Sequence, residues 1–512
     1  MKTILKLGTD AMALLLCGLL VFSPQLVLAQ APVVSGATKT TVTNAGNGVP
    51  VVNIAAPSAS GLSHNTFTSY NVDAHGLVLN NGDTSELFRQ SQLAGQVAGN
   101  QNLASGNQAS IILNEVTGNS RSMLAGFTEV LGGKADLILA NPFGITSNGA
   151  GFINTDRVSL VTGTPNITGG ALSGFSVNGG DILISVSGLN ADAQQMLDLV
   201  SRKISVDGQV NAQTLNLVAG RNSWDYASGD ATTLGRNDTS PSYAIDSSAL
   251  GGMYAGRISL KATEDGVGVR ILGDAAATAD DFSITSEGKI ELNSQLSATR
   301  DLSLTSASTG ADAIKATDAS LTAGRNLGLT ATSGGATLNG GVLVATNNLT
   351  YNLGTLTDAS TATVITDNNK RYAGGAMTLN GTGSWALSGV NYGAASALAL
   401  TTSSLSLSTA NPVTLYSDGS LALRTTSDLT LTNASLNSVG DMTLTSDTGA
   451  LDVTYNEARI RSSGGNISLN AASGLTNVGI ITADVGDVIV RVNGVVHNSG
   501  TLHAFGALDI AD

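Results

Sequence analysis

The chain has 512 residues and a formal net charge of −14, with 42% hydrophobic, 4% aromatic and 12% charged residues and 61 glycines. Leu, Val and Ile spread along the whole chain argue against a disordered low-complexity protein, and 24 Lys and Arg without a basic patch argue against a nucleic-acid partner. The length exceeds an ordinary single globular core, so a repetitive all-β protein of short strands and tight turns fits best.

The first 29 residues have the pattern of a secretory signal peptide. Lys2 and Lys6 give a basic start, Ala11–Phe22 an apolar centre, and small residues around Ala29 a cleavage site. The apolar centre is too short to span a bilayer comfortably, and no later stretch is apolar enough for a transmembrane segment. Cys17 is the only cysteine, so the exported protein is expected to lack disulfides.

A strand, a turn and a second strand are predicted within Ala125–Asn154. The apolar run Ala135–Ala140 ends at Asn141-Pro142-Phe143-Gly144, and Ile145 begins the next extended stretch. Proline presets the backbone for a β-turn and glycine tolerates the conformation that follows. Local chemistry therefore predicts the turn without assigning it a role.

One segment departs from the β pattern. In Leu189–Ile204, the apolar residues recur at helical spacing, namely Ala193, Met196, Leu197, Val200 and Ile204. Asn190 or Asp192 is a suitable amino-terminal cap. This pattern predicts one short helix docked on the β structure.

From Arg257 onward, an apolar-x-apolar marker recurs at intervals of 20 to 28 residues. Both apolar residues of a marker share one face of a strand, and a period in this range is typical of a solenoid. The pairs are Ile258/Leu260, Phe282/Ile284, Leu302/Leu304, Leu327/Leu329, Leu349/Tyr351, Met377/Leu379, Leu398/Leu400, Leu421/Leu423, Met442/Leu444, Ile467/Leu469, Val488/Val490 and Leu508/Ile510.

These markers predict an all-β, right-handed parallel β-helix with an amino-terminal cap, extra-helical hairpins and one short helix. Stacked coils about 4.8 Å apart pair their backbones and build a continuous apolar core. A β-sandwich of hairpins is the alternative, but two-residue hairpin turns do not recur between the markers.

Extra residues should loop out at corners, and Thr366–Gly375 is expected in such an excursion. No capping segment follows the last marker, so residues 271–512 are expected to lack a carboxy-terminal cap, as in a fragment of a longer chain.

Residues suited to catalysis or metal binding are few. The four histidines, His64, His75, His497 and His503, lack metal-ligand spacing, and Gly132-Gly133-Lys134 lacks the rest of a phosphate loop. Asp280-Asp281 is best interpreted as a polar corner before a marker. Some parallel β-helices are polysaccharide lyases, which remain the enzymatic alternative, but no acidic cluster with a basic partner is visible. We therefore expect no catalytic site, no metal and no cofactor.

The amino-terminal half resembles the secretion domain of the filamentous haemagglutinin family, the exported partners of two-partner secretion systems. The resemblance covers nearly all of the first 270 residues, with its motifs in order. The matching segments are Gly48–Ile54, Gly61–Asn65, Tyr70–Val72, Gly76–Asn81, Leu93–Gly95, Gly99–Leu103, Ile111–Gly118, Ser122–Gly126, Glu129-Val130, Lys134–Ile145, Asn148–Asp156, Leu189–Arg221 and Tyr243–Gly268.

Two turn motifs mark this family's secretion domain, Asn-Pro-Asn-Leu and Asn-Pro-Asn-Gly. Here they correspond to Asn100, Gln101, Asn102 and Leu103, and to Asn141, Pro142, Phe143 and Gly144. Gln101 replaces a proline and Phe143 replaces an asparagine. The resemblance assigns these turns to secretion, either through contact with a transporter or by shaping the β-helix.

The resemblance implies a division into a signal peptide (1–29), a two-partner-secretion domain (30–270) and a β-helical repeat region (271–512). It implies export from a Gram-negative bacterium through the periplasm, with recognition by the periplasmic domains of an outer-membrane β-barrel transporter. The expected product is a secreted, cell-surface adhesin without enzyme activity, whose host-cell or bacterial receptor is not specified. The alternatives are the amino-terminal part of a contact-dependent growth inhibition exoprotein, or of a haemolysin.

Overall fold

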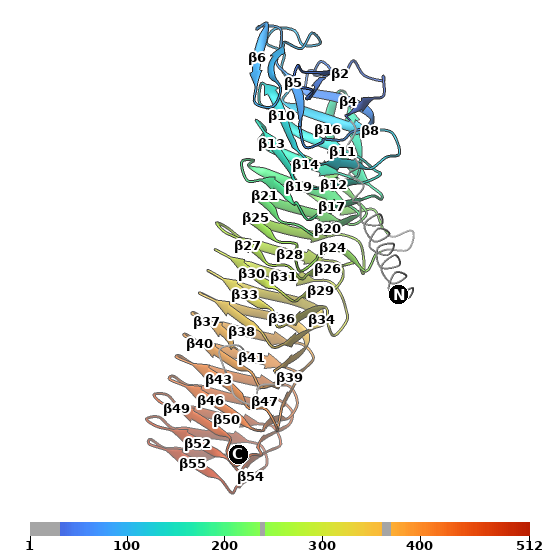
Figure 1. The fold of residues 1–512 in the computed structure, drawn as a ribbon. Helices are drawn as coiled ribbons and strands as arrows, with labels where there is room; N and C mark the ends of the chain where they lie inside the picture. Colours follow the sequence, from blue (N-terminus) through green and yellow to red (C-terminus); the bar gives the residue numbers. More distant parts are fainter. Residues whose placement is uncertain (1–30, 236–240, 361–369, 512) are drawn as a thin grey trace, which may run out of the picture.

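The computed structural model describes residues 31–235, 241–360 and 370–511. In these ranges the chain forms a long parallel β-helix, with the amino-terminal strands at one end and the carboxy-terminal strands at the other (Figure 1). The predicted signal peptide lies outside the described residues. The described residues contain β-strands and no helix, and the prediction of an all-β parallel β-helix is confirmed.

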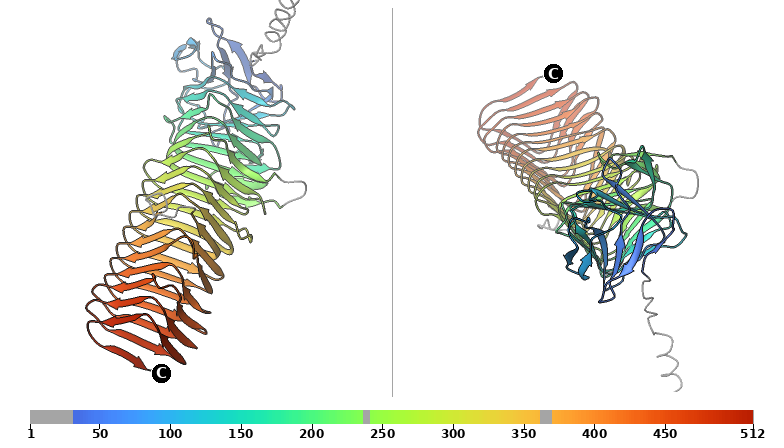
Figure 2. Two further views of the ribbon diagram at one scale, coloured as in Figure 1. Left: turned by 60° about the horizontal axis from the view of Figure 1, so that its bottom comes forward. Right: turned by 90° about the horizontal axis from the view of Figure 1, so that it is seen from above.

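Three parallel ladders run along the rod, and each coil between the first and the last contributes a strand to all three (Figure 2). Ladder 1 consists of β3 (Pro50–Asn53), β5 (Leu77–Asn81), β10 (Phe127–Gly132), β13 (Ala150–Ile153), β18 (Leu189–Ala191), the first part of β21 (Val210–Ala219) and of β25 (Met253–Ala262), β27 (Ala275–Ala277), β30 (Gln295–Ala298), β33 (Ser320–Ala323), β35 (Val342–Ala345), β37 (Lys370–Ala373), β40 (Asn391–Ala394), β43 (Val413–Ser417), β46 (Ala434–Ser438), β49 (Arg459–Ser462), β52 (Ile480–Ala483) and β55 (Thr501–Ala504).

Ladder 2 contains the repeated markers. It consists of β4 (Leu62–Ser69), β8 (Ile111–Val116), β11 (Asp136–Ala140), β14 (Arg157–Val161), β19 (Met196–Ser201), the second part of β21 and β25, β28 (Phe282–Ser286), β31 (Leu302–Ser306), the first part of β34 (Leu327–Asn339) and of β36 (Leu349–Ala359), β38 (Met377–Gly381), β41 (Leu398–Thr402), β44 (Leu421–Thr425), β47 (Met442–Ser446), β50 (Ile467–Ala471), β53 (Val488–Val492) and β56 (Leu508–Ala511).

Ladder 3 closes each coil. It consists of β9 (Ser122–Leu124), β12 (Ile145–Ser147), β17 (Asp181–Ile184), β20 (Lys203–Val206), β24 (Tyr243–Ser247), β26 (Gly268–Ile271), β29 (Ile290–Leu292), β32 (Ile314–Thr317), the second part of β34 and β36, β39 (Ser384–Ser388), β42 (Ser404–Leu407), β45 (Leu429–Leu431), β48 (Ala450–Val453), β51 (Gly474–Asn477) and β54 (Val495–Asn498).

The marker residues stack directly on one another. Ile258 pairs in register with Phe282 and Leu260 with Ile284, and the same pairing continues from coil to coil down to Leu508 and Ile510. All marker residues are buried except this last pair, which is 49% exposed. Period-two burial in the marker strands therefore produces one continuous apolar core.

The amino-terminal end is closed by antiparallel strands, as predicted. β1 (Val33–Val34) pairs with β4, and β2 (Thr41–Asn44) pairs with β3. Two further elements lie outside the coils. A hairpin of β6 (Phe88–Ser91) and β7 (Gly95–Ala98) covers apolar residues on the outer face of ladder 1, and an antiparallel sheet of β15 (Thr164–Thr168), β16 (Ala171–Val177), β22 (Asn222–Asp225) and β23 (Ala231–Thr233) covers the outer face of ladder 2.

The predicted helix at Leu189–Ile204 is wrong, because this segment forms β18, β19 and the start of β20. β19 has both faces buried: Leu197 and Leu199 enter the main core, while Val200 packs under Trp224 of the outer sheet. A strand buried on both faces loses its period-two signal, and the resulting apolar run imitates helical spacing. Pairing of β19 with β14 on one side and β21 on the other then stabilises this segment as a strand and not as a helix.

The excursion predicted at Thr366–Gly375 is only partly described. Residues 366–369 lie outside the described residues. Lys370–Ala373 is not a loop but strand β37, paired with β35 and β40. The prediction is wrong for that portion, because Arg371 and Ala373 are inward-facing and buried, which returns the chain to the ladder.

Candidate functional site

The first turn, Asn100–Leu103, lies where the chain returns from the β6–β7 hairpin toward ladder 2. Leu103 N donates to Asn100 O at 3.0 Å, which closes a β-turn, and Asn102 N donates to the Asn100 side-chain Oδ1 at 3.0 Å. Asn100 Nδ2 donates to the carbonyls of Ile54 and Asn80, each at 2.9 Å. The Asn100 amide is thus buried with both ends satisfied, and it ties the turn to the first coils.

The third and fourth positions of this turn also face inward. Asn102 Nδ2 donates to Lys39 O at 2.8 Å and to Ile54 O at 3.1 Å, linking the turn to the cap. Leu103 is buried in the main core. Gln101 is the exposed member, and its Nε2 reaches only Gly99 O at 3.1 Å. The turn therefore closes without the proline that the family motif has at this position.

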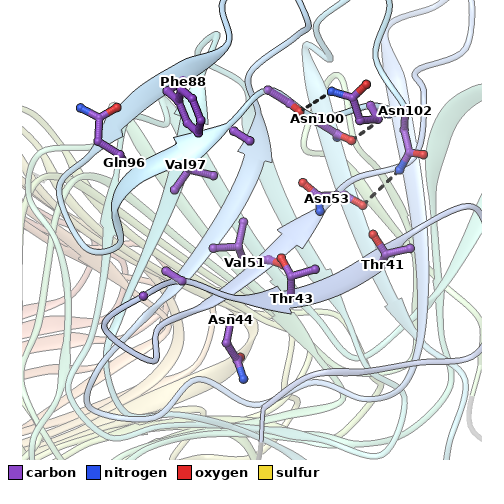
Figure 3. Close-up of a pocket in the computed structure, with 15 residues that line it drawn as sticks. Thr41, Thr43, Asn44, Val51, Asn53, Phe88, Gln96, Val97, Asn100 and Asn102 are labelled. Carbon is purple, nitrogen blue, oxygen red and sulfur yellow. Dashed lines mark hydrogen bonds between the residues drawn. The ribbon is translucent and has the colours of Figure 1, made fainter.

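A groove of about 560 Å³ runs beside this turn (Figure 3). On one side it is lined by Thr41 and Thr43 of β2 and by Val51 and Asn53 of β3, and on the other by Phe88, Gln96 and Val97 of the hairpin. Leu87 and Phe88 at the hairpin are 85% and 61% exposed. The turn thus stands at the end of an open groove whose lining includes the exposed Phe88.

The second turn, Asn141–Gly144, forms the corner between β11 of ladder 2 and β12 of ladder 3. Its geometry repeats that of the first: Gly144 N donates to Asn141 O at 3.1 Å, and Phe143 N donates to Asn141 Oδ1 at 2.9 Å. Asn141 Nδ2 donates to Ser120 O at 2.9 Å and to Ser122 Oγ at 3.0 Å. Asn141 is fully buried, and it joins three segments at one corner.

Gly144 and Phe143 differ in what constrains them. Gly144 has φ of 109°, and a Cβ there would lie 2.8 Å from the Arg121 guanidinium, so only glycine fits. Arg121 in turn donates to Ile145 O at 3.1 Å and forms an ion pair with Asp181. Phe143 is 52% exposed and only its backbone amide serves the turn. Its side chain is free to vary without changing the corner.

The two turns are separate features. They share the same asparagine geometry, but no hydrogen bond joins one turn to the other within the described ranges. Sequence reasoning missed the related buried amides beside them: Asn81 Nδ2 donates to Ala109 O and Gly133 O, and Asn65 Oδ1 accepts from Ala55 N and Thr40 Oγ1. An asparagine directly after an apolar strand, as in Leu79-Asn80-Asn81-Gly82, was the available signal.

The hairpin beside the first turn is anchored by Asp83. Its carboxylate accepts from Ser85 Oγ at 2.5 Å, from Gly106 N at 2.6 Å and from Arg89 at 2.8 Å. The Ser85 hydroxyl and the Gly106 amide, which bind the ionised form, lower the pKa of Asp83 from 3.8 to about 2. The contribution to stability is therefore present above pH 3.8 and is lost as the pH falls toward about 2.

We expect the amide resonance of Gly106 to keep its neutral-pH chemical shift down to pH 3, because Asp83 stays ionised there. An NMR titration of the isotope-labelled protein measures this directly. The Asp83→Asn variant is the control, and its Gly106 resonance should not titrate. A midpoint near the ordinary aspartate pKa of 3.8 would contradict the anchoring role of Asp83.

Among the described residues, no group of three or more His, Cys, Asp or Glu is arranged to hold a metal ion. None of the described segments forms a helix long and apolar enough to cross a membrane.

The family comparison confirms the resemblance to a two-partner-secretion domain. A model of the TPS secretion domain matches residues 29–292. The crystal structure of the filamentous hemagglutinin secretion domain aligns with 36% identity and a TM-score of 0.48, covering 60% of this chain and 98% of that one.

Several curated relatives are nucleases or toxins by name. The chain is 40% identical over 366 residues to the 16S rRNA endonuclease CdiA of Enterobacter cloacae. That alignment covers 69% of this chain and 11% of the relative. It is 41% identical over 270 residues to the toxin CdiA of Yersinia pestis, and 45% identical over 253 residues to a tRNA nuclease CdiA of Escherichia coli, in each case 8% of the relative. This chain therefore spans about a tenth of the length of these relatives. Because the family model covers more than half of the chain, the protein belongs to the family of exoproteins that carry a TPS secretion domain, which two-partner secretion exports.

Proposed function

We propose that this chain is the amino-terminal export and display section of a surface adhesin, with residues 30–270 recognised by an outer-membrane β-barrel transporter. Residues 271–512 extend the rod away from that domain. The observation that carries the proposal is that the family's secretion domain and the repeat region form one core, with ladder strands in register across β25, β28 and β31.

The transporter's contact is proposed at the surface around the first turn. Asn100 and Leu103 are buried, so in the folded protein they act through shape. Gln101 and Phe88 line the groove and are exposed, and Leu87 is exposed next to Phe88 in the chain, so these residues are available to a partner. At the second turn only Phe143 is well exposed, which suits a turn that is kept for its corner geometry.

Folding of the rod supports passage through a barrel. Each coil contacts mainly the coils before and after it, so folding can proceed from the cap outward as the chain emerges. The stretch after the predicted signal peptide has no cysteine that could be cross-linked in the periplasm.

A second candidate is the amino-terminal part of a contact-dependent growth inhibition exoprotein. The similarity to the Enterobacter cloacae CdiA extends over 366 residues, beyond the 29–292 matched by the family model, which favours this candidate. Because the match covers 11% of that relative, its named nuclease activity is not proposed for residues 1–512. Continuation of the reading frame into a nuclease-like tail, followed by a small immunity gene, would favour this candidate over the adhesin.

Co-expression tests the export step. We expect the chain to reach the medium or the cell surface only when a cognate outer-membrane barrel transporter is also produced, because the secretion domain requires that partner. Immunoblotting of medium and cells, with protease added to intact cells, measures the exported fraction. A transporter lacking its periplasmic domains is the control. Equal export without the transporter would overturn the proposal.

A further inference from the structure

The outer face of ladder 1 carries an ordered patch of side chains in the repeat region. On β37, β40 and β43, outward residues align in two rows along the rod. One row consists of Lys370, Asn391 and Thr414, and the other of Tyr372, Gly393 and Tyr416, continued by Asn437 on β46. Register therefore assembles residues from four coils into one small surface.

Tyr372 and Tyr416 enclose a slot whose floor is Gly393. Their strands are separated by one intervening strand, which places their backbones about 9.6 Å apart, twice the usual strand spacing. A Cβ on Gly393 would lie 3.3 Å from Tyr372 Cδ2 and 4.0 Å from Tyr416 Cδ1, so both rings lean over the glycine. The cavity has a volume of about 320 Å³, in the range of a small-molecule site.

The polar groups of this slot are available to a ligand. Lys370 Nζ lies 4.5 Å from the centre of the Tyr372 ring, and no carboxylate pairs with it among the described residues. The Asn391 side-chain amide and the Thr414 hydroxyl likewise have no hydrogen-bond partner among the described residues. At the opposite end, the Tyr416 hydroxyl is hydrogen-bonded to Asp418.

We propose that this slot binds a carboxylate-bearing pyranose sugar at the surface of a glycan. The C–H face of a pyranose packs on tyrosine rings, whose polar edges remain hydrated. Asn391 and Thr414 present a donor and acceptors suited to sugar hydroxyls. Lys370 supplies a positive charge for the sugar carboxylate and has no carboxylate partner among the described residues, on a protein whose net charge is −14.

Another tyrosine in ladder 1 is exposed but does not belong to a slot, and it serves as a comparison. Tyr254 on β25 also points outward and is 39% exposed, similar to Tyr416 at 37%. Its adjacent register positions hold Asn211 and Ala276. The positions two strands away hold Asn190 and Ser297, so none of these four positions carries a second ring. Tyr254 is therefore a matched control for a general loss of surface aromatic area.

The test uses the purified chain and titration calorimetry, with saturation-transfer NMR to detect the bound sugar. The probes are 3′-sialyllactose, trigalacturonic acid and neutral lactose, and the two acids separate an animal-type glycan from a polyuronate source. We expect at least one acid to bind tenfold or more tightly than lactose. Tyr372→Ala should weaken that binding at least tenfold, Lys370→Gln should remove the preference for the acid, and Tyr254→Ala should change nothing.

Gly393→Leu is a second variant, which fills the slot while both tyrosines remain. It should also abolish binding, and thermal unfolding checks that each variant is folded. The proposal is overturned if neither acid binds, if lactose binds as tightly as the acids, or if folded Tyr372→Ala and Gly393→Leu both bind like the wild type. Binding is measured on purified protein, so its failure is distinguishable from a failure of export.

Discussion

Replacing Asn141 with valine should lower the free energy of unfolding of the amino-terminal coils by about 2–4 kcal/mol, because the fully buried Asn141 side chain holds three hydrogen-bond partners at once. Ser120 O and Ser122 Oγ lose the Nδ2 donor, and Phe143 N loses its acceptor. All lie at one corner of the β-helix. Export should fall for the same reason, because a coil whose corner is destabilised offers no ordered strands for the next coil to pair with. Chemical denaturation and the secreted fraction measure the two effects.

Phe143→Asn is the matched control, since it restores the family residue at an exposed position of the same turn. It should leave the unfolding free energy within about 0.5 kcal/mol of the wild type, as surface substitutions usually do. Asn100→Val should behave like Asn141→Val, given the same pattern of bonds to Ile54 and Asn80. Normal stability and secretion of both valine variants would show that neither turn matters for folding or recognition.

Arg371→Met should have the second large effect, a loss of about 3–5 kcal/mol from the coils around β36, β37 and β40. Arg371 and Asp358 are both fully buried inside the apolar core. Arg371 Nε and Nη2 donate to the Asp358 carboxylate at 3.0 and 2.8 Å, and Tyr392 Oη donates to Asp358 at 2.5 Å. Removing the guanidinium leaves a buried carboxylate with one neutral donor. Hydrogen exchange of the β36 to β40 amides measures the local loss.

The triple variant Arg371→Met, Asp358→Leu, Tyr392→Phe is the control for this cluster. Replacing a buried ion pair as a unit with apolar side chains is often neutral or stabilising. The triple variant should therefore recover most of the stability lost in the single one. A loss as large as that of Arg371→Met would mean that the cluster itself stabilises the coil.

The cluster also has a role in register. Residues 360–369 separate β36 from β37 in the sequence, and a slip of one residue in β37 would turn Lys370 and Tyr372 inward in place of Arg371. Arg371 Nη1 and Nη2 also donate to Gly341 O and Gly340 O of the preceding coil, at 2.8 and 3.0 Å. A correct register satisfies all of these groups together. We therefore interpret the buried pair as a register device that also positions Tyr372 in the outward slot.

The repeat was readable from the sequence because its signal is local. Leu302-x-Leu304 or Leu421-x-Leu423 shows its period without knowledge of any other coil, and the strands stack in register as the markers suggested. The segment Met196–Val200 led to a wrong helix prediction for the opposite reason. Its second buried face depends on Trp224 and Tyr226, which are distant in sequence and reach it through the outer antiparallel sheet.

The positions of the turns could be predicted from the sequence, but the burial and hydrogen-bond partners of their asparagines could not. Asn, Pro and Gly indicated the β-turn at Asn141, and the family resemblance located the turn at Asn100. Their burial, and the partners Ile54, Asn80 and Ser120 that satisfy their side chains, depend on strands folded against them from other coils. Motif matching therefore located the residues, but it did not distinguish a buried structural amide from an exposed contact.

The sequence by itself determined that this protein is a solenoid with a secretion domain, because period-two apolar pairs and the ordered family motifs are properties of contiguous residues. Only the tertiary structure decided which polar residues face inward and which outward residues meet. Arg371 and Asp358 are 13 residues apart in sequence and join inside the core, while Tyr372 and Tyr416 come from different coils. Such pairings depend on the length of every coil and corner between them, which sets the register that brings the side chains together.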